Sequence, residues 1–340
     1  MKAHVLRRDS VSLGILFFAM AIGLGLGSVN RYDPRGVKGL SDSRSYVQMM
    51  DGPTRSETEP VRSMRVLVPL LAHPIAEIAR GRIGSWNPEF LALLVVNAMF
   101  ISWAATLMIA IGERITGSRL TGLVAALLYL LTFNVGSLYL HGLVESVEAW
   151  ALIALTWLML RGNATLIPVV AFLAALGKET SVPLFLAFLI GWQCASAEWG
   201  SRRARVLLVV SVALSQAAAL LLAQWVNGDP VMLPWHVGGV GRLGEVFAPK
   251  RIATLVNREW LYAFAWLAPL GLARMRSIPF AWRIAGASSG STALLLSLFA
   301  GAAGNVVRPV FNSIAPLLIL AAAIYLVERL GTLSRPESPV

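Results

Sequence analysis

The sequence predicts an all-α protein: a polytopic helical bundle in a membrane, with about ten transmembrane helices and one helix on the membrane surface. Three observations indicate this class. Of the 340 residues, 56% are hydrophobic and 14% are charged, whereas a soluble domain carries about 25% charged residues. Mean hydropathy is +0.68. The apolar residues also form long runs, and charged residues are concentrated between these runs.

Each apolar run is a candidate helix, because a helix of about 20 residues crosses the hydrocarbon layer. The runs are Ser10–Ser28, Pro88–Ile111, Leu120–Leu140, Gly142–Leu160, Ala164–Leu176, Ser181–Ala197, Val206–Val226, Trp260–Ala273, Ile284–Gly304 and Pro309–Val327. Ala164–Leu176 and Trp260–Ala273 are short for a full crossing, so we expect them to tilt, extend into flanking residues or end in a cavity. Ser10–Ser28 follows basic residues as a signal peptide does, but its length and lack of a cleavage site indicate a retained first span.

The run Met64–Ala79 is also apolar, but we expect it to lie on the membrane surface. It is shorter than a crossing helix and contains Arg65, His73, Pro74 and Glu77. With this helix outside the bilayer and the N-terminus in the cytoplasm, the short basic loops fall on the cytoplasmic side, as the positive-inside rule requires. These loops are Glu113–Arg119, Arg161, Glu198–Arg205 and Arg274–Arg283. A crossing helix at this point would export the later basic loops.

We expect one membrane domain over residues 1–340, with two large extracytoplasmic segments at 30–87 and 227–258. The net charge of +11 comes from residues between the apolar runs, which indicates contact with anionic lipid headgroups and not with nucleic acid. The single cysteine, Cys194, excludes an internal disulfide, and the histidines are not at metal-ligand spacing. No cofactor is firmly implied, although carboxylates of the first segment could bind a divalent metal.

The first external segment contains two candidate catalytic carboxylates, Asp33 and Asp42. Either could deprotonate an acceptor hydroxyl. Tyr46 follows Asp42 by one helical turn and is a candidate substrate contact. Arg62 and Arg65, at the start of the surface helix, could bind a phosphate through their guanidinium groups. In the alternative interpretation the segment is a solvated loop, with Asp33 in a turn and Asp42 capping a helix.

The segment HGLVES contains His141 and Glu145, and Glu148 follows three residues after Glu145. Spacings of four and three residues place these side chains on one face of a helix that begins at the outer surface. Ionisable residues within a membrane helix are costly and usually face a cavity or a partner. The pattern therefore predicts residues that line a site, or else ion pairs that serve packing.

Four more candidates lie on the same outer side. Lys178 and Glu179 form the turn GKET between two apolar runs, and Arg308 lies in NVVRP. Lys178 and Arg308 are suitable counter-charges for a lipid phosphate, or they extend to the headgroups without a specific ligand. His236, in the second external segment, is a weaker candidate for lining a site.

The order of these segments resembles that of the GT-C superfamily of integral membrane glycosyltransferases. Those enzymes have a cytoplasmic N-terminus, a first span, an external loop with a catalytic acid and a surface helix, and then a helical bundle. The matching segments here are SDSRSY, MRVLVPLLA, HGLVESVEAW, GKET and VRP. As architecture the resemblance covers most of the chain, but as sequence it covers only these short patches.

The resemblance implies transfer of a sugar from a polyprenyl-phosphate-linked donor to a glycan, lipid or protein acceptor. The site would face outward from a bacterial-type inner or plasma membrane. Asp42 would be the base, with Asp33 as its rival, and Arg65, Lys178 and Arg308 would contact the donor phosphate. The chain departs from the family in showing no separate soluble domain and no unique counterpart of a second first-loop acid.

Two other functions fit the same residues. A transporter or lipid flippase could use Glu145, Glu148 and Lys178 as an intramembrane relay, although the internal repeat typical of transporters is not visible. A non-catalytic assembly subunit is the other alternative. The position of Asp42 relative to Arg65 and Lys178 distinguishes the subunit from an enzyme.

Overall fold

The computed structural model describes residues 2–29, 41–50, 60–83, 87–196, 200–228, 230–231, 233, 248–255, 258–300 and 307–333. Within these ranges every regular element is a helix and no strand occurs. The first elements are α1 (Lys2–Val29), α2 (Ser41–Met50), α3 (Pro60–Ser63), α4 (Leu67–Ala79), α5 (Pro88–Thr116), α6 (Arg119–Leu130), α7 (Phe133–Ser137), the 3-10 helix η1 (Tyr139–His141) and α8 (Glu145–Arg161). They are followed by α9 (Ile167–Gly177), α10 (Ser181–Ala195), α11 (Arg202–Asn227), α13 (Pro249–Leu255), α14 (Arg258–Phe264), α15 (Leu267–Ala273), η3 (Met275–Ser277), α16 (Phe280–Ala300) and α17 (Val307–Leu333).

Among the described residues, four helices are long and apolar enough to cross a membrane. They are Pro88–Thr116, Arg119–Ser137 (α6 and α7 taken together), Arg202–Asn227 and Val307–Gly331. Shorter apolar helical stretches lie in α1, α4, α9 and α10. The all-helical class is therefore confirmed, and these helices indicate a membrane protein. The larger number of about ten spans stays a prediction.

The long helices end at residues whose chemistry favours helix ends. Asn87 precedes α5 and its side chain accepts a hydrogen bond from the Phe90 amide at 2.9 Å, while Gly117 after α5 has φ of 71°. Ser201 caps the start of α11 in the same way, and Gly228 follows its end with φ of 73°. Such caps satisfy amide and carbonyl groups that the helix itself leaves unpaired.

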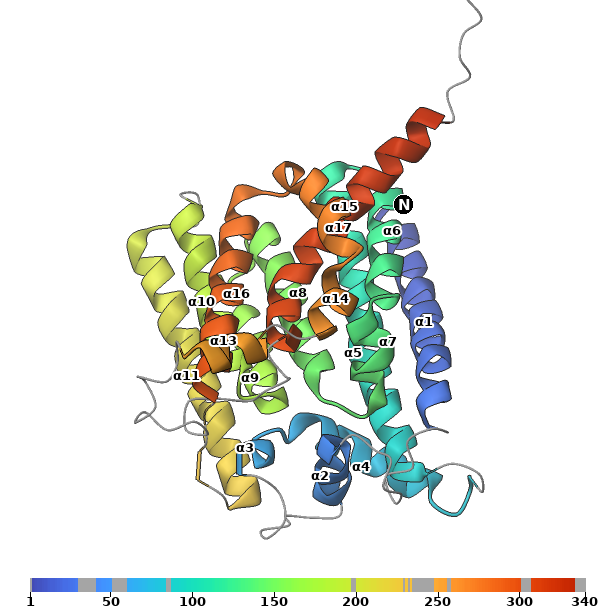
Figure 1. The fold of residues 1–340 in the computed structure, drawn as a ribbon, viewed down its shortest axis with the longest axis vertical. Helices are drawn as coiled ribbons and strands as arrows, with labels where there is room; N and C mark the ends of the chain where they lie inside the picture. The colour runs from blue at the N-terminus through green and yellow to red at the C-terminus, as the bar shows by residue number, and fades with distance from the viewer. Residues whose placement is uncertain are drawn as a thin grey trace, which may run out of the picture.

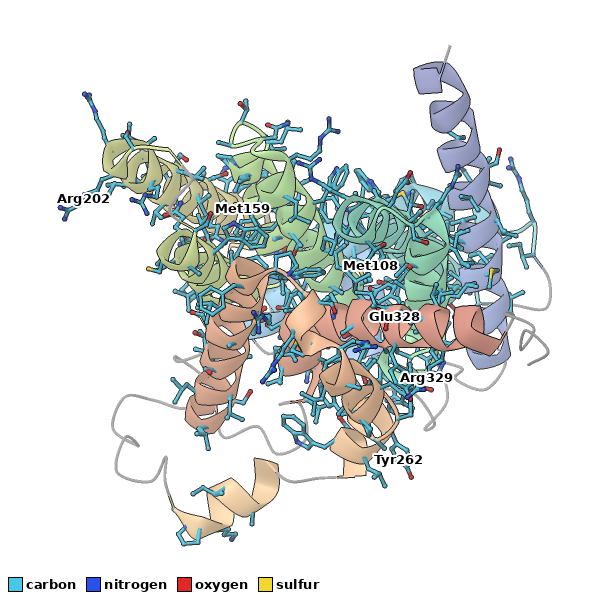
Figure 2. All side chains as sticks on the ribbon, turned by 90° about the horizontal axis from the view of Figure 1, so that it is seen from above. Met108, Met159, Arg202, Tyr262, Glu328 and Arg329 are labelled. Carbon is cyan, nitrogen blue, oxygen red and sulfur yellow. The ribbon has the colours of Figure 1, made fainter. Side chains whose placement is uncertain are left out.

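The helices form a bundle with α2, α3 and α4 gathered at one end (Figure 1). The start of α1 and the end of α17 lie at the opposite end of the bundle. Viewed from that opposite end, Arg202 at the start of α11 points away from the bundle (Figure 2). Met108 of α5 and Met159 of α8 are buried in one apolar core that includes residues of both α1 and α17. Helices α2, α3 and α4 and the start of α1 thus lie at opposite ends of the bundle.

The predicted surface helix corresponds to α4, which begins three residues later than expected. Met64, Arg65 and Val66 connect α3 to α4 instead of extending the helix, and the Arg65 amide bonds to the Arg62 carbonyl at 3.0 Å. α4 packs against α5 and α2. Its other face exposes large apolar side chains, including Leu70 at 65% and Ile78 at 63%. An apolar exposed face is typical of a helix that lies in a membrane interface.

Two of the predicted helices are broken. The run Leu120–Leu140 divides into α6, α7 and η1, because Thr132 adopts an extended backbone and its hydroxyl bonds to the Tyr129 carbonyl at 2.7 Å. The run Trp260–Ala273 divides into α14 and α15 at residues 265–266. Pro269 explains this break, because a proline clashes with the carbonyl four residues earlier and is tolerated in the first turn of a new helix.

Candidate functional site

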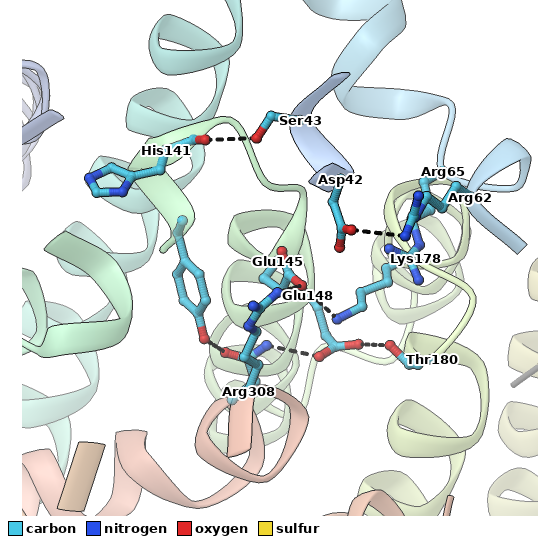
Figure 3. Close-up of polar contacts among 12 residues, drawn as sticks. Asp42, Ser43, Arg62, Arg65, His141, Glu145, Glu148, Lys178, Thr180 and Arg308 are labelled. Carbon is cyan, nitrogen blue, oxygen red and sulfur yellow. Dashed lines mark hydrogen bonds and ion pairs between the residues drawn. The ribbon is translucent and has the colours of Figure 1, made fainter. Parts of the chain in front are cut away.

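Charged side chains from α2, α3, the α3–α4 connection, α8, the α9–α10 turn and α17 meet at one end of the bundle (Figure 3). We call this group the charged cluster. Its members are Asp42, Arg62, Arg65, Glu145, Glu148, Lys178, Glu179 and Arg308. All eight were predicted from the sequence as site residues. Asp33 and His236 lie outside the described residues.

Glu145, at the start of α8, is the centre of the charged cluster. Its Oε1 atom lies 3.2 Å from Lys178 Nζ and 3.2 Å from Arg308 Nη1. The three side chains are 4%, 6% and 9% exposed. A buried carboxylate is tolerated because two cations offset the cost of removing its charge from water.

Two glycines place Glu145 and Lys178 together. Gly142 follows η1 with φ of 83°, and a Cβ atom at this position would lie 3.0 Å from Phe90 Cε2. Gly177 ends α9, where a Cβ atom would lie 2.4 Å from Val147 Cγ1. Only glycine allows α9 to approach α8 this closely, which brings the following Lys178 to Glu145.

Glu148, one turn further along α8, receives hydrogen bonds from neutral donors. Asn312 Nδ2 donates to Glu148 Oε1 at 2.8 Å, and the Thr180 hydroxyl donates to Oε2. Ser181 Oγ lies 3.5 Å from the same oxygen. Because Thr180 is close to Lys178 in sequence and Asn312 is one turn after Arg308, Glu148 joins the two elements that carry the cations of Glu145.

Arg65 connects α2 and the α3–α4 connection to the α9–α10 turn. Its Nε and Nη2 atoms donate to the two oxygens of Glu179 at 2.8 and 2.7 Å, and Nη1 donates to the Tyr46 hydroxyl at 2.6 Å. Burial raises the pKa of Tyr46 well above its usual range, although Arg65 opposes this effect. Burial opposes the charged form of Arg65 as well, but the Glu179 carboxylate outweighs it and the pKa of Arg65 is raised. Arg65 thus remains a cation with Glu179 as its partner.

Asp42, in the first turn of α2, lies at the edge of the charged cluster. Its Oδ1 atom is 2.9 Å from Arg62 Nη2, and the two side chains are 18% and 19% exposed. Arg62 Nη1 also donates to Ser45 Oγ at 3.4 Å. Asp42 is therefore more accessible than Glu145 or Glu179, whose side chains are 4% and 2% exposed.

The prediction that His141 shares one helical face with Glu145 and Glu148 is wrong. His141 ends η1, and Gly142 separates it from α8, so it does not share a helix with Glu145 and Glu148. Its backbone carbonyl accepts a hydrogen bond from Ser43 Oγ at 3.0 Å, which holds α2 against η1. Burial lowers the pKa of His141 to about 4, so the imidazole is neutral at pH 7.

Sequence reasoning assigned no role to Tyr139, Thr180, Asn312 or Glu259. The Tyr139 hydroxyl donates to Asn312 Oδ1, which orients the Asn312 amide toward Glu148. Glu259 of α14 interacts electrostatically with Arg308. Asn312 could have been found from its four-residue spacing after Arg308, which places both on one face of α17. Tyr139 and Glu259 carry no comparable signal.

No group of three or more His, Cys, Asp or Glu side chains in the described part of the chain is placed to hold a metal ion. The charged cluster instead alternates carboxylates with cations. Such an arrangement can bind an anion through its cations and accept a proton at a carboxylate. Comparisons with protein-family models and with curated protein sequences find no match to this chain.

Proposed function

We propose that the protein is an integral membrane glycosyltransferase. It transfers a sugar from a polyprenyl-phosphate-linked donor to an acceptor at the extracytoplasmic face of a bacterial-type inner or plasma membrane. The observation that carries this proposal is the convergence of an accessible carboxylate, Asp42, with the buried cations Lys178 and Arg308 in one charged cluster. These residues come from α2, the α9–α10 turn and α17.

The chemistry assigns different roles to the two kinds of group. The oxygen of the acceptor hydroxyl attacks the anomeric carbon of the donor sugar, and Asp42 accepts the proton that this hydroxyl loses. The bond between that carbon and the phosphate oxygen breaks, and polyprenyl phosphate leaves. Lys178 and Arg308 stabilise the negative charge that develops on the leaving phosphate, in a site with little water.

We propose a role for Arg65 that differs from the phosphate contact implied by the resemblance. Its Nε, Nη1 and Nη2 atoms all bond to Glu179 or Tyr46. We therefore propose that Arg65 holds the external segment against the bundle, and that Lys178 and Arg308 are the phosphate contacts. Asp42 is thereby linked to the α9–α10 turn, because its partner Arg62 lies three residues before Arg65, which pairs with Glu179.

The transporter alternative requires ionisable groups that lead across the helical layer. The residues predicted for that relay, Glu145, Glu148 and Lys178, instead lie at helix ends, in the first turn of α8 and just after α9. Their position at one end of the bundle favours a reaction at an interface.

The test uses the purified full-length protein in lipid nanodiscs with a panel of polyprenyl-phosphate-linked sugars. Mass spectrometry would follow loss of the lipid-linked sugar and release of polyprenyl phosphate, with water or an added glycan as acceptor. We expect turnover of at least one donor and its loss in Asp42→Asn. Glu77→Gln, a change at an exposed carboxylate of α4, is the control. Movement of an intact donor between leaflets, with no release of polyprenyl phosphate, would contradict the proposal.

A further inference from the structure

The two cations proposed to bind a donor phosphate already share an anion of the protein itself. Lys178 Nζ and Arg308 Nη1 both lie 3.2 Å from the same oxygen, Oε1 of Glu145 (Figure 3). A phosphate oxygen between the same two cations would need this position. Glu145 therefore occupies the place that the ligand would take.

Two buried polar atoms of this trio have no hydrogen-bond partner among the described residues. Glu145 Oε2 and Arg308 Nε are buried and make no hydrogen bond with any residue that the structure describes. Both side chains are more than nine-tenths buried. Unpaired buried polar atoms are costly, and native proteins usually satisfy them with a partner. Nε of Arg308 can donate a hydrogen bond to a bound anion. Oε2 of Glu145 can accept a hydrogen bond or take up a proton.

The surroundings of Glu145 contain cations that already have carboxylate partners. The groups that interact electrostatically with Glu145 are Tyr46 from α2, Arg65 from the α3–α4 connection, Tyr139 from η1, Lys178 from the α9–α10 turn and Arg308 from α17. Two further carboxylates lie close by: Asp42 interacts with Tyr46 and Arg308, and Glu148 interacts with Tyr139. Arg62 pairs with Asp42, and Arg65 pairs with Glu179. Glu259 adds a further carboxylate near Arg308. An anion that enters this site without a compensating cation would leave buried negative charge unbalanced, which is strongly unfavourable.

We propose that Glu145 is an internal counter-ion that an incoming phosphate replaces, and that Glu145 takes up one proton from solvent as the phosphate binds. The phosphate oxygens then contact Lys178 and Arg308. The protonated Glu145 carboxyl becomes a donor and completes a hydrogen bond to the phosphate. The assignment of this phosphate to a lipid-linked sugar donor rests on the proposed function, whereas the exchange itself concerns only anion binding.

Uptake of one proton makes phosphate affinity depend on pH. The dissociation constant of the wild-type protein should rise about tenfold for each pH unit while the free carboxyl is ionised and the bound one is protonated. Glu145→Gln removes the competing charge and keeps a group that can donate a hydrogen bond. This variant should bind phosphate more tightly than wild type at pH 8.5, by at least about tenfold, and should show no such pH dependence.

The probe is geranyl methyl phosphate, a phosphodiester that stays a monoanion throughout the range, so that the ligand itself does not titrate. Binding to the detergent-solubilised full chain would be measured by isothermal titration calorimetry from pH 6.5 to 8.5. This range lies above the pKa of His141, which burial lowers to about 4. Glu89→Gln is the matched control, because Glu89 is also a buried carboxylate in an ion pair, 3.0 Å from Arg80. It should behave as wild type.

Weaker phosphate binding by Glu145→Gln, or pH-independent binding by the wild type, would overturn the proposal. If the variant does not fold, the wild type alone still tests the proposal. Calorimetric titrations in two buffers of different ionisation enthalpy give the number of protons taken up on binding, and the proposal requires one. Phosphatidylglycerol and dimethyl phosphate are further probes. If both bind as tightly as the geranyl diester, replacement of Glu145 by a phosphate is supported, but preference for an isoprenoid donor is contradicted. This outcome separates the inference from the proposed function.

Discussion

Arg65 and Glu179, 114 positions apart in the chain, form a two-point ion pair in which each carboxylate oxygen accepts one guanidinium hydrogen bond. The pair joins the segment that leads into α4 to the turn that carries Lys178. It thereby connects the proposed base, Asp42, with the proposed phosphate site. The side chains are 12% and 2% exposed. Each charge therefore offsets part of the cost of removing the other from water.

Loss of one partner of this pair should destabilise the protein. We expect Glu179→Ala to lower the free energy of unfolding by about 3–5 kcal/mol, because it leaves the buried Arg65 cation uncompensated. The double variant Arg65→Met, Glu179→Leu should recover most of this loss, since no buried charge remains. Thermal melting in detergent would measure both. A double variant no more stable than Glu179→Ala would show that the pair is not coupled in this way.

Removal of the proposed base should abolish catalysis without unfolding the protein. Asp42→Asn is expected to lower the rate of sugar transfer by about 10²–10⁴-fold, the usual contribution of a positioned acid or base. Its melting temperature should stay close to that of wild type, because Asp42 is at the edge of the cluster. Asp42→Glu should retain more activity than the amide. An active Asp42→Asn enzyme would move the role of base to Asp33.

Removal of either proposed phosphate contact should affect the donor more than the acceptor. For Lys178→Ala and for Arg308→Ala we expect kcat/KM for the lipid-linked donor to fall by about 10²–10³-fold, because each cation stabilises charge on the departing phosphate. The KM for the acceptor should change little. Steady-state kinetics with each substrate varied in turn would measure the difference, and equal effects on both substrates would argue against phosphate contact.

His141 should make the folded protein less stable in mild acid. Burial lowers its pKa from 6.5 to about 4. Between these two values the unfolded chain binds a proton that the folded protein does not, so stability falls as the pH falls from 6.5 toward 4 and is unaffected by His141 above 6.5. His141→Gln should lose this component. Melting temperatures of both proteins at pH 7.5, 6 and 5 would show it as a smaller acid decline in the variant.

The helical elements could largely be predicted from the sequence because apolar runs and helix-end residues are local features. The exceptions are instructive. The break near Thr132 lies inside a run that contains no charged residue and no proline. Hydropathy does not register the hydrogen bond from the Thr132 hydroxyl to the Tyr129 carbonyl. The break before α15 was readable from Pro269, whose ring disfavours a helix through residue 265.

The membership of the charged cluster was predictable, but its pairing was not. Glu145 was identified from its spacing with His141 and Glu148, Lys178 from the GKET turn, and Arg308 from its position at the outer end of an apolar run. Which carboxylate meets which cation depends on the register between helices that are far apart in sequence, and no local pattern encodes that register. The close approach at Gly177, which places Lys178 next to Glu145, is visible only once Val147 is seen packed against it.

The central claim is that a lipid-linked donor binds with its phosphate in the charged cluster, next to Asp42. A cryo-electron microscopy structure with a non-hydrolysable polyprenyl-phosphate-sugar analogue tests it most directly. We predict phosphate density within about 3 Å of Lys178 Nζ and the Arg308 guanidinium, with the anomeric carbon facing Asp42. A headgroup bound at the opposite end of the bundle, near Arg202, would contradict the account.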